Sequence, residues 1–190
     1  MTRPPRQSTD SWIKAAFRAL SSGGLGAIKA ERLARDLGVS KGSFYWHFKD
    51  VSALTGAMIS HWEEAATHDV IRVLEAGGGT PGARLHRLVE VATSDIAAPY
   101  GGAAAETAIR AWGQHDGAVA RAVANVDAAR LTYLAALFAE AGIAAPDMAA
   151  RILYGASLGL EQLAQSSATT RTTDLSALLS ALLDGDITGP

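Results

Sequence analysis

The residues best suited to chemistry in this chain lie in residues 38–49, which read GVSKGSFYWHFK. Tyr45, Trp46 and His47 combine flat apolar surfaces with hydrogen-bonding atoms, and Lys41 adds a positive charge. Such a group of side chains is costly on a surface unless a partner covers it. Aromatic, hydroxyl and cationic groups together suit contacts to both the phosphates and the base edges of double-stranded DNA.

The preceding residues predict the element that positions this group. Residues 28–37 place apolar side chains at spacings of three and four, which indicates an amphipathic helix. Gly38 supplies the left-handed conformation that ends such a helix, and Ser40 is a suitable N-cap for the next one. Phe44 and Phe48 lie four residues apart and are expected to face inward. The pattern predicts a helix-turn-helix over about residues 29–48.

The run from Gly38 to Phe48, after an earlier helix that contains Trp12, Ile13 and Lys14, resembles the DNA-binding domain of the TetR family of repressors. The resemblance covers roughly residues 10–60. It implies an all-α fold, in which an N-terminal three-helix helix-turn-helix domain precedes a C-terminal helical bundle for ligand binding and dimerisation, with about nine helices in total. It also implies a sequence-specific DNA-binding transcriptional regulator, most simply a repressor. As a homodimer, it would bind an inverted-repeat operator and be released by a small-molecule effector.

Charge supports a division into two regions. Residues 1–50 hold nine Lys or Arg and four Asp or Glu, which leaves eight basic and fifteen acidic residues in 51–190. A polyanion is attracted to the first region and repelled by the second. We expect a flexible basic arm at 1–10, the helix-turn-helix domain at 11–50, and an effector-binding and dimerisation domain at 51–190.

Each side chain of the helix-turn-helix has an expected role. Basic and hydrogen-bonding groups are expected on phosphate or sugar oxygens: Lys41, Lys49, Tyr45 and His47. Ser43 and Trp46 are expected to contact bases, Trp46 through a thymine methyl group, and Gly42 allows close approach. The predicted DNA-binding set is Lys29, Ser40, Lys41, Gly42, Ser43, Tyr45, Trp46, His47 and Lys49.

Two positions depart from the family pattern. Family members usually enter the second helix through Ser or Thr, whereas this chain has Ala27-Ile28-Lys29-Ala30. Lys29 is the candidate to replace the phosphate contact of the missing hydroxyl. A basic residue is also common just after the position of Asp50, where this chain has Val51. Any unusual operator preference is expected to originate at these two places.

The C-terminal region is expected to hold the effector and the second subunit. The resemblance assigns the dimer interface to the last two helices, over about residues 146–183. Its expected residues are Leu153, Ala156, Gly159, Leu160, Leu163, Leu175, Leu178, Leu179 and Leu182. A small, mostly apolar effector is expected among aromatic side chains, which are Trp62, Trp112, Tyr133, Phe138 and Tyr154. We expect residues 166–173 to form a loop and Asp174 to cap the last helix.

Other functions find weaker support. A small helical enzyme or a metal sensor is the alternative, the latter through His61, Glu64 and His68 on one helix face. The GxGxxG-like run at 77–82 lacks a strand-helix context, and the GxSxG-like run at 155–159 has no histidine after it. The favoured interpretation has no enzymatic activity, cofactor or metal. With no cysteine and no uninterrupted apolar run of about 18 residues, a cytoplasmic protein without membrane contact is expected.

Overall fold

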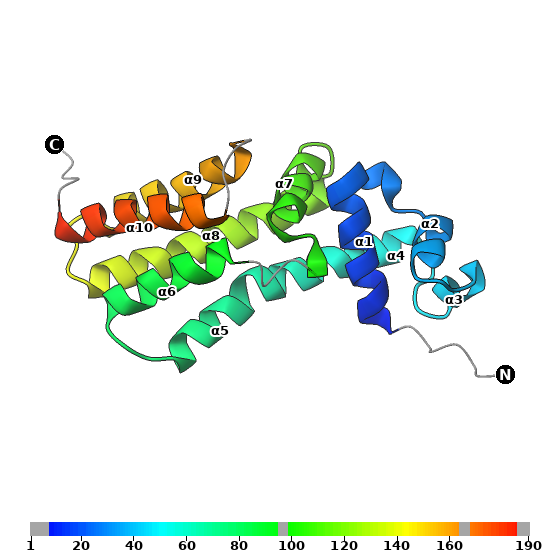
Figure 1. The fold of residues 1–190 in the computed structure, drawn as a ribbon, viewed down its shortest axis with the longest axis horizontal. Helices are drawn as coiled ribbons and strands as arrows, with labels where there is room; N and C mark the ends of the chain where they lie inside the picture. Colours follow the sequence, from blue (N-terminus) through cyan, green and yellow to red (C-terminus); the bar gives the residue numbers. More distant parts are fainter. Residues whose placement is uncertain (1–7, 95–98, 164–167, 186–190) are drawn as a thin grey trace. The chain divides into compact units, whose positions relative to one another are not determined.

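The computed structural model describes residues 8–94, 99–163 and 168–185, and these ranges contain helices and no strand. The α-helices are α1 (Thr9–Gly23), α2 (Ala30–Asp36), α3 (Lys41–Tyr45), α4 (Val51–Glu63), α5 (Asp69–Ala76), α6 (Pro81–Thr93), α7 (Gly102–Gly113), α8 (Gly117–Glu140), α9 (Pro146–Gln162) and α10 (Ala168–Asp184). A π-helical turn, Glu64–His68, joins α4 to α5 without a break, so the described residues form nine continuous α-helical segments besides a 3-10 turn at Leu25–Ala27. The expected all-α fold is confirmed (Figure 1).

The chain divides into two compact units. Unit 1 comprises residues 1–62 and 96–123, and unit 2 comprises residues 63–95 and 124–190. Unit 1 therefore adds α7 and most of α4 to the three helices of the expected DNA-binding domain. These units describe packing rather than function, so the functional boundary at residue 50 stays a prediction.

Unit 1 is built around α1, which packs against both α2 and α7. Ser8 caps α1 by accepting a hydrogen bond from the Ser11 amide at 3.1 Å. Trp12, Phe17 and Leu20 fill its buried face and are at most 1% exposed. Because α1 begins at Thr9, the expected flexible arm is wrong for residues 8–10, and residues 1–7 lie outside the described residues.

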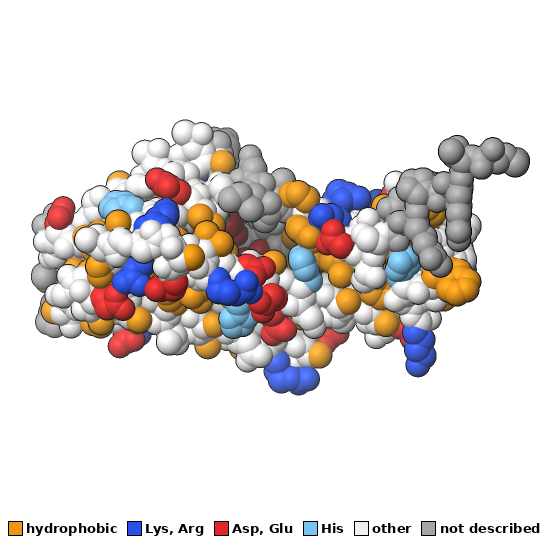
Figure 2. Space-filling view, turned by 90° about the horizontal axis from the view of Figure 1, so that it is seen from below, with side chains coloured by type: hydrophobic (Ala, Val, Ile, Leu, Met, Phe, Trp, Pro, Cys, Tyr) orange, Lys and Arg blue, Asp and Glu red, His pale blue; other side chains and the backbone are white. Residues whose placement is uncertain are grey.

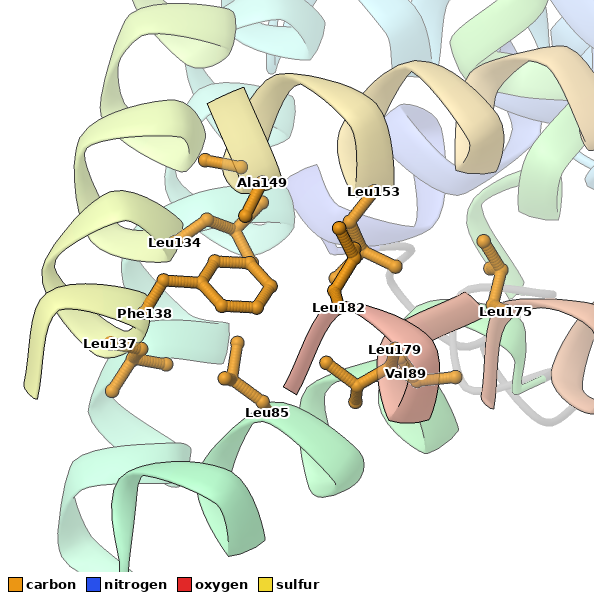
Figure 3. Packing of buried hydrophobic residues seen from close by; sticks show 11 residues of the cluster. Leu85, Val89, Leu134, Leu137, Phe138, Ala149, Leu153, Leu175, Leu179 and Leu182 are labelled. Atoms are coloured by element: carbon orange, nitrogen blue, oxygen red, sulfur yellow. The ribbon is translucent and has the colours of Figure 1, made fainter. Parts of the chain in front are cut away.

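Unit 2 has a core to which four helices contribute (Figure 3). α10 packs against both α6 and α9, and side chains of α8 complete the cluster. Phe138 and Leu179 are fully buried at its centre. The full set of buried side chains is Leu85, Val89, Leu134, Leu137, Phe138, Ala149, Ala150, Leu153, Leu175, Leu179 and Leu182.

Helix α8 is long and apolar enough to cross a membrane by length and composition alone, with a mean hydropathy of 1.2 over its most apolar 18 residues. Its Leu134, Leu137 and Phe138 are nevertheless buried against side chains of α6, α9 and α10. Packing within unit 2 therefore accounts for part of the apolar character of this helix, of whose most apolar window 28% is buried.

Capping side chains mark the starts of several helices, whereas the predicted start of α10 is wrong. The Asp50 carboxylate accepts a hydrogen bond from the Ala53 amide at 2.8 Å, and Thr80 accepts one from the Ala83 amide at 3.3 Å. Asp116 does the same at the start of α8. The last helix begins at Ala168, so the expected cap at Asp174 and loop at 168–173 are wrong, while 164–167 lie outside the described residues. The hydroxyls at these positions bond carbonyls one turn back, as Thr172 does to Ala168 at 2.9 Å, which keeps them compatible with a helix.

Candidate nucleic-acid interface

The turn between α2 and α3 has the predicted geometry. Gly38 has φ +67°, a left-handed conformation that glycine adopts without steric cost. The Gly38 amide donates to the Arg35 carbonyl at 3.1 Å, and the Val39 amide donates to the Ala34 carbonyl at 2.9 Å. These bonds satisfy carbonyls at the end of α2 and set the direction in which α3 leaves.

Buried aromatic rings support the segment that follows the turn, which we call the recognition segment, residues 41–48. Phe44 is fully buried, and its ring centroid lies 5.4 Å from that of Trp12, in an edge-to-face arrangement. The Phe48 ring lies 5.8 Å from Phe44 and is 6% exposed. Both phenylalanines face inward, as their spacing predicted. They anchor the recognition segment to α1 and fix which of its side chains face solvent.

The regular helix in this segment is shorter than the sequence suggested, because α3 ends at Tyr45. Trp46 and His47 continue in a tight turn, in which the His47 and Phe48 amides donate to the Phe44 carbonyl at 2.9 and 3.0 Å. Ser40 occupies the N-cap position, although its side chain accepts no capping hydrogen bond.

Two aromatic side chains of the recognition segment project into solvent. Trp46 is 83% exposed and Tyr45 is 55% exposed. Figure 2 shows hydrophobic side chains on the surface at the end of unit 1 where α2 and α3 lie. Full burial of a side chain of this size stabilises a protein by about 1.5 to 3 kcal/mol. Because Trp46 and Tyr45 are exposed, they contribute only a small part of this stabilisation to the fold. A partner surface is the physical explanation for their exposure.

Lys41 makes an ion pair that the sequence analysis missed. Its ammonium group is hydrogen-bonded to Glu31, which lies in the first turn of α2. The hydrogen bond to Lys41 lowers the pKa of Glu31, and the same bond raises the pKa of Lys41. The sequence offered only a weak signal, because the two residues are ten apart and each also fits a solvated helix face.

The remaining recognition residues differ in how firmly they are held. His47 is half-buried, and its Nδ1 lies 3.3 Å from the Thr9 hydroxyl of α1. Ser43 is half-buried, whereas Lys49 is exposed. Gly42 is exposed, and a Cβ added to it would make only an ordinary contact of 3.7 Å with the Ser40 hydroxyl. The fold itself therefore does not require glycine at position 42.

The two positions that depart from the family pattern lie at helix starts. Lys29 is exposed at the N-cap of α2, where its side chain makes no capping bond. Val51 is the half-buried first residue of α4, and the preceding Asp50 provides the cap. The exposed Lys29 is therefore available for a phosphate contact at the start of α2, whereas Val51 at the start of α4 offers no charge for one.

Solved structures share this fold over almost the whole chain. A transcriptional regulator from Rhodococcus sp. Rha1 aligns with a TM-score of 0.75 at 17% identity, covering 96% of this chain and 100% of that one. A TetR transcription regulator from Haloarcula marismortui aligns at 0.73 and 17% identity, over 93% and 96% of the two chains. A Saccharomonospora viridis protein solved in complex with choline aligns at 0.76 and 14%, over 90% and 95%. No curated protein matches the sequence significantly.

The sequence match lies where the recognition segment is. Residues 13–58 match the family described as bacterial regulatory proteins, tetR family. The resemblance of this region to the TetR family is confirmed. The matched residues include most of α1, the turn at Gly38 and the first part of α4, and they contain the whole recognition segment. The match supports a DNA-binding regulator, while the roles of single side chains stay predictions.

A residue beyond the helix-turn-helix also contacts helices α1 and α4 within unit 1. Tyr100, just before α7, donates a hydrogen bond from its hydroxyl to Asp10 of α1 at 2.7 Å. Lys14 pairs with the same carboxylate at 2.8 Å. The Tyr100 ring lies 4.3 Å from the His61 ring of α4 and 5.9 Å from the Phe17 ring of α1, centroid to centroid. Residues outside the family match therefore contact both α1 and α4.

The five predicted effector residues do not all lie in one compact unit. Trp62 and Trp112 belong to unit 1, and the other three belong to unit 2. Phe138 is fully buried in the core of unit 2, which makes it a core residue. Tyr133 donates a hydrogen bond to Glu75 at 2.6 Å.

Tyr154 belongs to a polar network in unit 2. Its hydroxyl donates to Asp127 at 2.7 Å and accepts from the Arg130 guanidinium at 3.1 Å. Arg130 also donates to the Ala66 carbonyl in the π-helical turn at 3.1 Å. Thr67, beside it, is 2% exposed, and its hydroxyl has no hydrogen-bond partner. This network places polar groups from α8, α9 and the π-helical turn together, and the aromatic pattern gave no sign of it.

The structure divides the predicted dimer residues into two groups. Four of them are at most 4% exposed in the core of a single chain, namely Leu153, Leu175, Leu179 and Leu182. They pack within unit 2, which leaves little of these side chains for a second copy, so an interface there would have to rest mainly on the other predicted residues. The others remain accessible to some degree: Ala156, Gly159, Leu160, Leu163 and Leu178. Leu163 is 61% exposed.

The residues of the alternative functions have other partners. The Glu64 carboxylate is ion-paired with Arg72, and the His61 ring stacks on Tyr100. Across the described part of the chain, no three His, Asp or Glu side chains are gathered as a metal site. Ser157 of the GxSxG-like run lies inside α9 and donates to the Tyr154 carbonyl at 2.8 Å, unlike a nucleophile on a strand-to-helix turn.

Proposed function

We propose that this protein is a cytoplasmic repressor, which binds an inverted-repeat operator as a homodimer and leaves it when a small molecule binds. The observation that carries the DNA part of the proposal is the exposure of Trp46 and Tyr45 on a segment held in place by buried rings. Rigid support with an exposed polar-aromatic surface is what base recognition in the major groove requires.

The proposed contacts follow the exposure of each side chain. Trp46 would press on a thymine methyl and Ser43 would bond a base edge. Phosphate or sugar contacts fall to Tyr45, Lys49 and Lys29, and to His47 in the orientation set by Thr9. Because the fold does not require glycine at position 42, we propose that Gly42 is there to let the backbone of α3 approach DNA closely. Ser40 makes no side-chain capping bond that DNA binding would have to break.

We assign the dimer interface to the exposed face of α9 and α10. A Cβ added to Gly155 or Gly159 would meet nothing within 4 Å, so a second helix has room to approach there. Leu163 supplies exposed apolar surface at the end of α9. Burying a few leucines at about 1.5 to 3 kcal/mol each offsets much of an association cost of about 4 to 15 kcal/mol. The accessible residues of this face are Ala156, Gly159, Leu160, Leu163 and Leu178.

The effector is proposed to bind in unit 2. The polar network of Arg130, Asp127 and Tyr154 offers charged and hydroxyl groups among apolar helices, which is typical of ligand sites. The similar fold of the protein solved with choline supports a small ligand. An effector can change DNA binding only if it binds one conformation of the protein more tightly than another. We propose that the contacts of Tyr100 with α1 and α4 transmit this change of conformation to the DNA-binding helices.

Selection of bound fragments from a random DNA library, followed by gel shift, tests this function. A dimer should enrich an inverted repeat whose half-sites lie about 34 to 36 Å apart, or a multiple of that distance. The enriched sequence should also occur in DNA near the gene of the protein, and sedimentation should show a dimer. Recovery of fragments with no common sequence, or binding by a monomer to single half-sites, would contradict the proposal.

A further inference from the structure

An acidic side chain, Glu31, is paired with a lysine of the recognition segment. Glu31 and Lys41 form an ion pair in which the side chains are 58% and 50% exposed, so both are accessible from solvent. Exposed ion pairs contribute only about 0 to 1 kcal/mol to stability, so the fold gains little from this one. A carboxylate beside phosphates also weakens DNA binding. The pair therefore costs affinity for DNA in general without a matching gain in stability.

The position of the pair matches a place where sequence is read. Lys41 is the first residue of α3, and the N-terminal residues of a recognition helix contact base edges in the major groove. Glu31 lies in the first turn of α2 and reaches Lys41 across the turn between the helices. The carboxylate therefore favours one direction for the end of a side chain that would otherwise sample many conformations.

The hydrogen-bonding capacity of the ammonium group suggests its target. A lysine ammonium carries three N–H donors, and one of them is directed at Glu31 Oε1. Two donors remain, and guanine presents two acceptors, O6 and N7, side by side in the major groove. A lysine engaged only with phosphate would not need a fixed direction, because phosphate accepts a point charge from many angles.

We propose that Lys41 reads a guanine in each half-site and that Glu31 is a positioning residue, which directs the ammonium to the base and away from phosphate. This inference rests on the proposed function and deepens it by naming one base of the operator. It also revises the phosphate role expected for Lys41 from sequence. Because Glu31 already neutralises this lysine, Lys41 adds little to the counterion release that drives binding to random DNA.

The test compares operator selection and salt dependence for the wild type and three variants. Lys41→Ala removes the proposed reader, and Glu31→Gln removes the positioning charge while keeping the side-chain size. Asp36→Asn is the matched control, because it removes the same charge from another exposed acid of α2. Circular dichroism checks that all variants fold, which the exposure of the substituted side chains leads us to expect.

We expect wild-type selection to yield a guanine position whose preference over adenine is about 5- to 150-fold and is lost in Lys41→Ala. Glu31→Gln should weaken that preference and bind random DNA more tightly, with a salt slope steeper by about 0.9, because the freed lysine then contacts phosphate. Asp36→Asn should keep the guanine preference.

Two results would overturn the inference while the proposed function stands. One is an enriched operator with no guanine whose preference depends on Lys41. The other is an equal effect of Glu31→Gln and Asp36→Asn on base preference and salt slope. Failure of the wild type to enrich any sequence would instead overturn the proposed function, and this inference with it.

Discussion

The recognition segment and helix α10 both carry large apolar side chains, yet the two regions use them in opposite ways. In the recognition segment Trp46 is 83% exposed, although Phe44 two residues earlier is fully buried. In α10, Leu175 and Leu179 are 3% and 0% exposed and pack against other helices of unit 2. Apolar character alone therefore does not mark a binding surface. A binding surface is indicated instead by an exposed apolar side chain, such as Trp46, whose backbone is held in place by buried neighbours such as Phe44.

The comparison also explains why the predicted dimer interface needed more correction than the predicted DNA-binding surface. A recognition segment is short and has one face toward α1, so two phenylalanines four apart determine which side chains are exposed. A helix of an all-helical bundle has several apolar neighbours, and the leucine pattern does not tell the core from the interface. The predicted interface consequently contained four residues that are buried within one chain.

The largest expected effect is the loss of stability when the buried Trp12 is removed. Trp12 is 0% exposed beneath the recognition segment, so Trp12→Ala should lower the free energy of unfolding by about 3 to 5 kcal/mol. Urea unfolding followed by circular dichroism measures this. A loss below 1 kcal/mol would mean that the ring is not the support we infer.

A matched pair of leucines tests the same contrast in unit 2. Leu179→Ala removes a fully buried side chain and should cost about 2 to 5 kcal/mol of stability. Leu163→Ala changes a side chain that is 61% exposed and should shift the stability of the subunit by less than about 0.5 kcal/mol. Denaturant unfolding of both variants at low protein concentration, where dimers dissociate, makes the comparison direct.

Leu163→Ala should have its effect on association instead. If the exposed face of α9 meets a second copy, this substitution weakens dimerisation, which sedimentation equilibrium detects. Equal destabilisation by the two leucine substitutions would contradict the division of α9 and α10 into core and interface residues.

The smallest expected effect concerns a polar contact of unit 2 that depends on pH. Burial, and then the hydrogen bond to Glu75, raise the pKa of Tyr133 from 10.0 to about 12. A raised pKa stabilises the folded protein below pH 10, and this stability is lost as the pH rises toward about 12. Tyr133→Phe should therefore cost about 0.5 to 1.5 kcal/mol at neutral pH.

The pH dependence provides the control for that variant. The difference in unfolding free energy between the wild type and Tyr133→Phe should shrink as the pH rises through this alkaline range. A difference that stays constant from neutral pH to pH 12 would show that the lost stability comes from packing rather than from the hydroxyl.

Much of the fold could be predicted from sequence because it depends on local signals. Gly38 acts within a few residues and has its predicted role in the structure, and Asp50 and Thr80 cap helices through equally local hydrogen bonds. The cap expected at Asp174 was wrong because α10 already begins at Ala168, and Thr172 and Thr173 lie inside it with their hydroxyls bonded to carbonyls one turn back.

The candidate site was predictable for the exposed side chains and not for their partners. The type and spacing of Tyr45 and Trp46 indicated a DNA-binding surface directly. The pairing of Lys41 with Glu31 and of His47 with Thr9 depends on how α1, α2 and α3 pack, which no local pattern encodes. The same limitation hid the network of Arg130 and Tyr154, which joins segments far apart in the chain.

The most direct test of the account is the effect of Trp46→Ala on operator binding and on stability, measured on the same protein preparation. We predict a loss of about 1 to 3 kcal/mol in affinity for the selected operator, with little change for random DNA. The free energy of unfolding should stay within about 0.5 kcal/mol of the wild type, because the side chain is 83% exposed. Unchanged operator affinity in a folded variant would contradict the claim that this exposed side chain reads DNA.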